Sequence, residues 1–173
     1  MAKTDAPSIN RKLEIISAAI EVFAEVGYYR ATTAQVAERA KISQPYIFRF
    51  FATKESLLLT ALEVSWSRVI ESFRKVLETT SPELLENKLI QEYEHIQALH
   101  LNEILLQMQA QTMREESIQE TMRGGFKEVR DMVLKAFEEA RLEKPEERTL
   151  LFLARGMLCN VAVALHMPEL MKG

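Results

Sequence analysis

The chain has 173 residues, 47% of them hydrophobic, with only 5 glycines and 5 prolines, a composition that favours helices over a turn-rich β fold. The single cysteine, Cys159, excludes an intramolecular disulfide, and without a metal-type Cys/His cluster in the sequence we expect neither a metal nor another cofactor. The net charge of −3 is unevenly distributed: the first 52 residues carry seven Lys/Arg against five Asp/Glu, and the remainder is acidic. This asymmetry fits a molecule whose first third meets phosphate.

The first third of the chain is predicted to form short helices separated by turns. Apolar residues at three- and four-residue spacing predict a helix over residues 10–26, which ends at Gly27. Thr32 and Gln35 form a capping box for a helix that reaches about residue 40. A three-residue turn at 41–43 leads to a short helix through Phe51, capped by Ser43, and a long helix is expected over residues 54–78.

The rest of the chain is predicted to be helical as well, over residues 82–100, 102–114, 116–141 and 145–166. We expect the pair Gly124-Gly125 to kink the third of these helices. The most apolar segment, residues 150–165, contains Arg155 and Asn160, and the N-terminus shows no signal peptide. We therefore expect a cytoplasmic, all-α protein with no membrane partner.

The span 33–51 has the pattern of a helix-turn-helix, with a small residue where two short helices cross. Ile47, Phe50 and Phe51 are predicted to pack inward. Four polar or ring-bearing residues then face outward: Gln44, Pro45, Tyr46 and Arg49. Glutamine pairs with adenine and arginine with guanine in the major groove, and an aromatic ring contacts a thymine methyl. The alternative is a tight helical hairpin with a solvated polar face.

Lys54 gives a second indication, because a cation in the first turn of a helix opposes the helix dipole. A DNA phosphate bound at that end would make the position of Lys54 favourable, because the ammonium and the free N–H groups would share one anion. Thr33 could donate to a phosphate in the same way at the start of its own helix. The alternative is an incidental surface lysine near Glu55.

The run TTAQVAERAKISQPYIFRFFATKESLL, residues 32–58, resembles the signature of the TetR family of bacterial repressors, and the preceding helix extends the match to about residues 10–60. The resemblance implies a three-helix helix-turn-helix domain over residues 1–52 that binds DNA and a helical ligand-binding and dimerisation domain over residues 53–173. It implies that residues 44, 45, 46 and 49 lie in or beside the major groove. It also implies that Thr33, Phe48, Phe50 and Lys54 approach the phosphates.

Two features depart from the family pattern. Lys41 stands where the turn often has glycine, so it must adopt a left-handed backbone or use another turn. Phe48 and Phe50 stand where the family often has Tyr or His, and without a hydroxyl they cannot donate a hydrogen bond to phosphate.

Residues 150–165 are apolar almost all the way round, so we expect a partner subunit to cover them, and the preceding helix could supply the other half of a four-helix interface. The TetR resemblance implies the same homodimer, which would bind a near-palindromic operator in double-stranded DNA. The alternative is an intrachain core. The predicted interface residues are Val133, Phe137, Leu150, Leu151, Met157, Leu158, Val161 and Leu165.

Apolar residues between the long helix and the C-terminal helices are candidates for a ligand pocket, although ordinary core is the alternative for each. The resemblance implies a small-molecule effector there, and a hydrophobic or amphipathic compound fits this lining. Release of a repressor from its operator by such an effector is the expected mechanism. The predicted pocket residues are Trp66, Phe73, Tyr93, Ile96, Met108 and Met113.

Two other classes of function compete with a DNA-binding regulator. An enzyme is not expected, because the sequence has no nucleophile–base pattern, phosphate loop or metal-ligand spacing. A helical small-molecule carrier or sensor without DNA binding would keep the pocket and the dimer but not the polar surface at 44–49.

Overall fold

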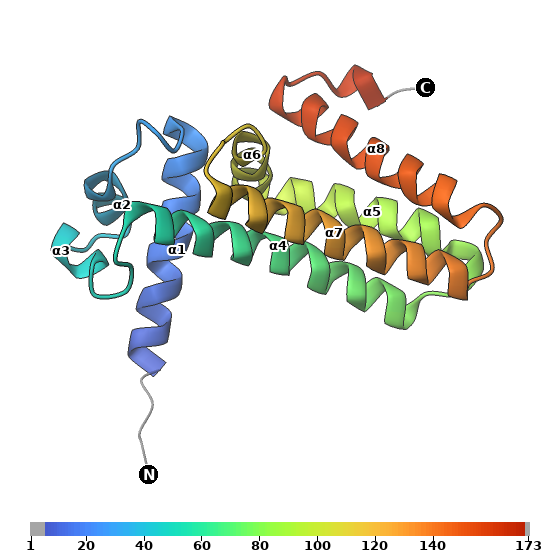
Figure 1. The fold of residues 1–173 in the computed structure, drawn as a ribbon, viewed down its shortest axis with the longest axis horizontal. Coiled ribbons are helices and arrows are strands. Elements are labelled where there is room, and N and C mark those ends of the chain that lie inside the picture. Colours follow the sequence, from blue (N-terminus) through green and yellow to red (C-terminus); the bar gives the residue numbers. More distant parts are fainter. Residues whose placement is uncertain (1–5, 172–173) are drawn as a thin grey trace, which may run out of the picture.

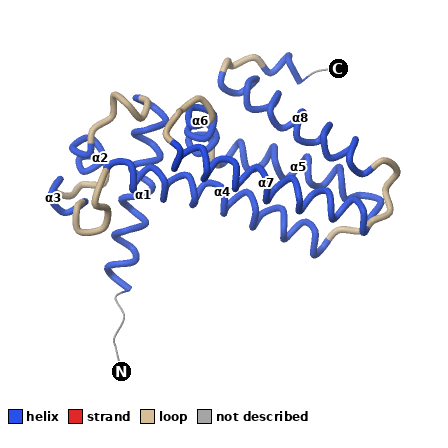
Figure 2. The backbone as a smooth tube through the Cα atoms, viewed as in Figure 1, coloured by secondary structure: helices blue, strands red, loops and turns tan. Residues whose placement is uncertain are grey.

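The computed structural model describes residues 6–171, which form helices joined by short loops, with no strand in that range (Figure 1, Figure 2). This confirms the predicted all-α class. The elements, including two short 3₁₀ helices (η1 and η2), are α1 (Ala6–Val26), α2 (Thr33–Arg39), α3 (Gln44–Ile47), α4 (Lys54–Thr79), η1 (Pro82–Leu84), α5 (Leu85–Leu99), α6 (Leu101–Ala110), α7 (Glu116–Glu139), α8 (Pro145–Ala164) and η2 (Pro168–Met171).

Helices α1, α2 and α3 gather at one end of the molecule, and α4 runs from this head into the body (Figure 1). The head has its own core, in which Phe23, Val36 and Ile47 are fully or almost fully buried. Gly27 ends α1 with φ +85°, a left-handed backbone that glycine adopts without strain, and its carbonyl accepts from the N–H of Ala31. The chain thus turns sharply enough to bring α2 back against α1.

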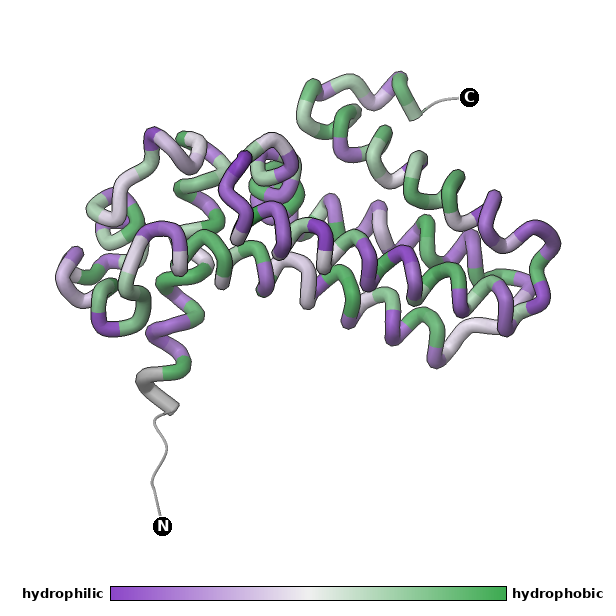
Figure 3. The backbone as a smooth tube through the Cα atoms, in the orientation of Figure 1, coloured by the Kyte–Doolittle hydropathy of each residue, from purple (hydrophilic) through white to green (hydrophobic). Residues whose placement is uncertain are grey.

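Helix α4 joins the head to the body because it packs against α1 and also against α5 and α7. Its buried residues continue along its whole length, from Leu57 near the head to Phe73 in the body. Figure 3 shows hydrophobic and hydrophilic residues recurring in turn along each helix, the pattern of helices that bury one face. Helix α8 lies over the far side of the bundle and packs against α5, α6 and α7 (Figure 1).

Most expected boundaries agree with the structure to within a few residues, and the larger differences have local causes. Helix α3 ends at Ile47 rather than at Phe51, and the chain continues as a turn in which the N–H of Phe51 still donates to Ile47 O. The predicted helix over 82–100 begins with the 3₁₀ turn η1 and ends at Leu99. Residues 116–139 form one continuous helix, so Gly124-Gly125 is not a helix break. No helix among residues 6–171 is long and apolar enough to cross a membrane.

Candidate nucleic-acid interface and ligand cavity

The turn between α2 and α3 uses a lysine in a left-handed conformation. Lys41 has φ +55°, its N–H donates to Glu38 O at 3.0 Å, and the next N–H, that of Ile42, donates to Ala37 O at 2.9 Å. These two bonds make a Schellman motif, which usually has glycine at the left-handed position. Of the two conformations expected for Lys41, the left-handed one is therefore present, at a cost of about 1 kcal/mol relative to glycine.

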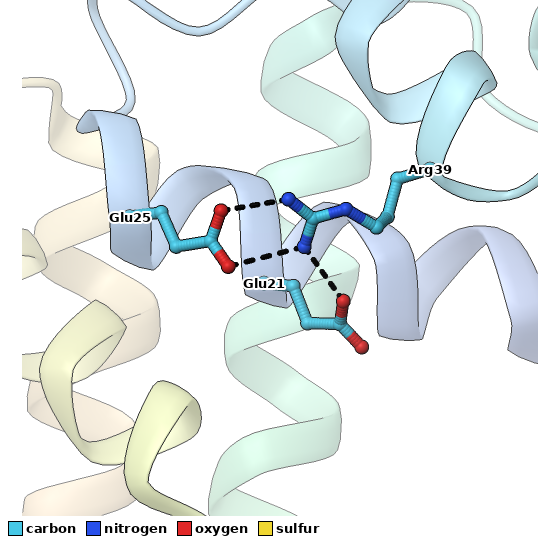
Figure 4. Close-up of polar contacts among 3 residues, drawn as sticks. All are labelled: Glu21, Glu25 and Arg39. Carbon is cyan, nitrogen blue, oxygen red and sulfur yellow. Dashed lines mark hydrogen bonds and ion pairs between the residues drawn. The ribbon is translucent and has the colours of Figure 1, made fainter.

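The orientation of α2 on α1 is fixed by an arginine that bridges the two helices (Figure 4). Arg39 donates to both carboxylate oxygens of Glu25, at 2.7 and 3.1 Å, and to Glu21 at 2.8 Å. The hydrogen bond from Arg39 holds the pKa of the Glu25 carboxyl below its usual range. Since all three side chains are exposed, the contribution to stability is modest, but the two-pronged geometry restricts the angle between the helices.

Helix α3 presents the predicted polar and ring-bearing set on the outside of the head. Gln44, Pro45 and Arg49 are exposed. The Gln44 amide nitrogen donates to Thr33 Oγ1 at 2.8 Å, so the first residue of α3 is tied to the first residue of α2. The Arg49 guanidinium lies 5.2 Å from the centre of the Tyr46 ring, which positions both side chains on the same surface.

The phenylalanines of this segment lie partly where they were expected. Phe51 is buried as predicted, but Phe50 is half-buried and packs edge-to-face on Tyr46 at 5.4 Å instead of entering the core. Phe50 still packs against the outside of the buried core as a partly buried residue. Phe48 is 50% exposed.

Lys54, expected to approach phosphate, instead bonds within the chain. Its ammonium donates to the carbonyls of Tyr28 and Ala31, at 2.9 and 3.0 Å, and lies 4.5 Å from the centre of the Tyr28 ring. Two of its three donors are therefore taken up by the loop between α1 and α2. Neither sequence interpretation, phosphate contact or incidental surface lysine, anticipated this role, because it depends on a loop more than 20 residues away.

An apolar cavity lies in the body between α4, α5, α6, α7 and α8. Three of the predicted pocket residues, Trp66, Phe73 and Tyr93, line it. Ile96 and Met113 are buried elsewhere in the core and Met108 packs against that core, so these three predictions of lining residues are wrong. The residues that sequence reasoning did not place in the cavity include Val69, Phe126, Val129, Phe152, Leu153 and Asn160.

The polar groups around the cavity form short buried networks. Asn160 Oδ1 accepts from the Tyr93 hydroxyl at 2.8 Å and from the Gln97 amide at 2.7 Å, and burial raises the pKa of Tyr93 to about 12. Gln107 donates to Ser65 Oγ at 3.0 Å. The hydroxyl of Tyr93 thus stays protonated at physiological pH and acts as a donor.

The exposed face of α8 carries a row of large apolar side chains. Leu150, Leu151 and Leu165 are 66%, 60% and 59% exposed, and Leu158 is exposed as well. Met157 and Val161, also expected at a dimer interface, are half-buried, and Met157 lines the cavity. The other two predicted interface residues, Val133 and Phe137, lie on α7.

Val133 and Phe137 are fully buried on α7 within a single chain. They cannot contact a partner without opening the core, so their assignment to the interface is wrong. The intrachain-core alternative holds for these two residues, because the helical stripe that contains them faces α4 and α8.

Sequence reasoning missed several contacts between the head and the body. Gln109 of α6 donates to Ala24 O of α1 at 2.8 Å, and the Tyr29 hydroxyl lies 2.9 Å from both carboxylate oxygens of Glu115. That hydrogen bond raises the pKa of Tyr29. Each pair is separated by more than 80 residues, so no local pattern could have shown it.

The comparisons agree with this arrangement. Residues 15–61 match the family model described as bacterial regulatory proteins, tetR family. The HTH-type transcriptional activator FasR of Mycolicibacterium smegmatis is 32% identical over 75 residues, which are 43% of this chain and 34% of the relative. The fatty acid metabolism regulator protein of Bacillus subtilis is 32% identical over 59 residues, 34% of this chain and 30% of the relative. These matches therefore cover about a third of each relative's own length.

Solved structures extend the likeness to almost the whole chain. A TetR transcription regulator from Haloarcula marismortui superposes with a TM-score of 0.80 and 25% identity, covering 94% of this chain and 92% of that one. The regulator FadR from Bacillus subtilis, solved in complex with stearoyl-CoA, has a TM-score of 0.75 and 16% identity over 93% of this chain and 89% of that one. At this identity the second likeness concerns the fold alone.

Proposed function

We propose that the protein is a transcriptional regulator of the TetR type that binds operator DNA as a homodimer and responds to a small molecule, because residues 15–61 match the tetR family model and the fold resembles that of a TetR transcription regulator. Residues 1–52 would read the DNA, and residues 53–173 would bind the effector and the partner. The observation that carries the proposal is the outward-facing set on α3, held in place by the Gln44–Thr33 bond and the Arg39 bridge.

The geometry of α3 supports direct contacts with the bases. Gln44 uses one N–H on Thr33 and keeps its carbonyl oxygen, an acceptor that matches the exocyclic amine of adenine. Arg49, restrained by the Tyr46 ring, would donate two bonds to one guanine. Pro45 would lie beside these contacts in the major groove, and Thr33, Phe48 and Phe50 would approach the phosphates.

A homodimer is proposed because α8 exposes a row of large apolar side chains, and an exposed apolar patch is typical of a protein–protein interface. Two copies related by a two-fold axis would bury Leu150, Leu151 and Leu165 against each other. The same axis would present two α3 helices to the two halves of a near-palindromic operator.

The effector is proposed to occupy the apolar cavity, whose lining suits a hydrophobic or amphipathic molecule. One relative is named a fatty acid metabolism regulator protein, and one neighbouring structure, that of FadR, holds stearoyl-CoA, so acyl compounds are the first class to test. We propose repression as the default, with release when the effector binds.

Helix α4 provides the coupling in this scheme, because Leu57 packs in the head and Trp66 and Phe73 line the cavity. An effector that binds better to a DNA-incompetent arrangement weakens operator affinity by its differential affinity, typically about 1–3 kcal/mol.

The proposal includes no catalytic activity and places the protein in the cytoplasm with the DNA. A carrier without DNA binding is the competing function, and salt dependence separates the two. For a DNA binder, the logarithm of the affinity falls with the logarithm of salt concentration with a slope of about 0.9 per phosphate neutralised.

The experiment selects bound fragments from sheared bacterial DNA and then measures affinity for the recovered site by fluorescence anisotropy. Arg49→Ala is expected to relax sequence preference at one base step by about 1–3 kcal/mol. Arg74→Ala, on the exposed body side of α4, is the matched control and should bind like the unmodified protein. No preference for any duplex over random competitor at modest ionic strength would contradict the proposal and leave the carrier.

A further inference from the structure

We propose that a second copy of the chain covers the mouth of the cavity, the part of its wall that meets solvent, so that the dimer rather than the single chain forms the complete ligand site. This inference rests on the homodimer and the effector cavity of the proposed function, and it assigns part of the cavity wall to the partner. Met157 of α8 connects the two features, because it lines the cavity and lies beside the exposed apolar row of the same helix.

The first observation is where the cavity meets solvent. The lining residues that α4 contributes, Trp66, Val69 and Phe73, are all buried. Exposed surface is found instead where the C-terminal end of α6 meets α7 and α8. The lining residues in that region that are exposed or half-buried are Gln111, Phe126, Leu153, Gly156 and Met157. The mouth of the cavity therefore lies between α6, α7 and α8.

The α5 side of α8 has no opening of comparable size. Tyr93 of α5 is half-buried and lines both the cavity and a crevice between α5 and α8. This crevice has only about 10 Å³ of space for the centre of a water-sized molecule, and one water needs about 10–15 Å³. Arg155 and Glu94, which form an ion pair at 3.3 Å, also line it. A ligand larger than water would therefore meet solvent at the mouth beside α7.

The second observation is the spacing of the exposed row on α8. Figure 1 shows α8 at the edge of the body, with the other body helices on one side of it. The uncharged residues of its outer face recur at alternating steps of three and four, the pattern of a seam between two packed helices. They are Leu151, Ala154, Leu158, Val161 and Leu165.

A second copy of the chain fits this row because the row can pair with itself. Its middle residue is Leu158, so a two-fold axis at that point would place Leu151 of each copy against the partner's Leu165. Met157 is the neighbour of Leu158 in the sequence, so it would lie close to the axis, where the two α8 helices approach each other.

The third observation shows that the mouth and the row face the same way. Leu150, at the edge of the row, is 66% exposed, and Met157 follows it by seven residues. Seven residues make almost two full turns of an α-helix, with a drift of only about 20°, so the two side chains point in nearly the same direction. A partner helix that runs along the row and covers Leu150 would therefore also cover Met157. The flexible thioether of Met157 could pack against a ligand and a partner side chain together.

The test measures how fast single thiols of the full-length protein react with N-ethylmaleimide in the dimer and in a monomer. Cys159, the single native cysteine, is replaced by serine, and one thiol is then introduced by Met157→Cys at the mouth or by Leu150→Cys on the row. Leu151→Asp separates the subunits by placing a carboxylate in the row, and analytical ultracentrifugation reports the oligomeric state. Residue 151 points about 120° away from residue 157, so this change does not alter the mouth directly.

Both thiols are expected to react at least about tenfold more slowly in the dimer than in the Leu151→Asp monomer, because a covered thiol reacts only when the interface opens. Lys75→Cys, on the exposed face of α4, is the matched control and should react equally fast in the two forms. If Leu151→Asp does not fold, Leu165→Asp at the other end of the row serves the same purpose.

A small apolar probe tests the ligand site itself. Toluene is expected to bind the dimer about 3- to 10-fold more tightly than the monomer, measured by calorimetry, because the covered mouth removes more of its surface from water. Equal affinity for the two forms, or no affinity for either, would overturn the inference.

The labelling results also separate this inference from the proposed homodimer. A dimer in which Leu150→Cys reacts slowly and Met157→Cys reacts fast would overturn the inference and leave the homodimer in place. Fast reaction of both thiols in the dimer, or a Leu151→Asp protein that remains a dimer, would locate the interface elsewhere and contradict both.

Discussion

The two neighbouring glycines of α7 predict opposite responses to the same substitution. A Cβ on Gly125 would lie within 2.5 Å of the Trp66 ring, whereas a Cβ on Gly124 would meet nothing within 4 Å. Replacing a helical glycine by alanine stabilises by about 0.8–1 kcal/mol when nothing clashes. Gly124→Ala should therefore stabilise the protein by about that amount.

At Gly125 the same gain is opposed by overpacking, which costs about 1–3 kcal/mol in a close-packed core. The ring that must move is buried and packs edge-to-face on Phe126 at 4.9 Å, so a shift of the ring would disturb that contact. Gly125→Ala should therefore destabilise the protein by up to about 2 kcal/mol, in contrast to its neighbour.

Urea unfolding followed by circular dichroism measures both variants, at one protein concentration because a dimer's stability depends on it. Trp66 emission should also shift in Gly125→Ala and stay unchanged in Gly124→Ala. Equal stabilisation by the two substitutions would refute the reasoning, because it would mean that α7 and Trp66 do not approach as closely as the structure places them.

Three further predictions concern the head. Lys54→Met should lower stability by about 1–3 kcal/mol in urea unfolding through loss of two charge-assisted bonds to carbonyls, whereas Lys75→Met, on the exposed face of α4, should change it little. Lys41→Gly should raise stability by about 0.5–1 kcal/mol because it relieves a left-handed backbone, and an unchanged melting temperature would count against that strain. Arg39 lowers the pKa of Glu25 below its unfolded value of about 4.3. The stabilisation of the fold by the Arg39–Glu25 pair is therefore complete above that pH and is lost as the pH falls through the folded pKa. Arg39→Met should therefore show a smaller fall in melting temperature between pH 6 and 3 than the unmodified chain.

Local signals predicted the head well. The Thr32 capping box and the Thr53 cap are present, with side-chain bonds to the N–H groups of Gln35 and Ser56. Such caps depend on residues three apart, so the sequence alone contains the relevant geometry. Ser43 occupies the predicted cap position of α3 but makes no side-chain bond there.

Long-range features were predicted less well, and for a common reason. The apolar stripe of α7 does not distinguish a partner subunit from the chain's own α4 and α8, so Val133 and Phe137 were placed at the wrong surface. Ile96 and Met113 show the same problem for the cavity, since hydrophobic periodicity identifies a buried face but not a void within it. The role of Lys54 needed the fold of a distant loop.

Helix α6 is ten residues long, and it contacts the cavity on one side and helix α1 on the other. Gln107 and Gln111, one turn apart, line the cavity, while Gln109 between them points the other way and donates to Ala24 O near the end of α1. A helix of this length moves as a rigid body. A ligand that displaces α6 from the cavity wall would therefore also displace the contacts of α6 with the C-terminal end of α1. The head would sense an occupant through the packing of α6 on α1, which includes the bond from the Gln109 side chain to Ala24 O.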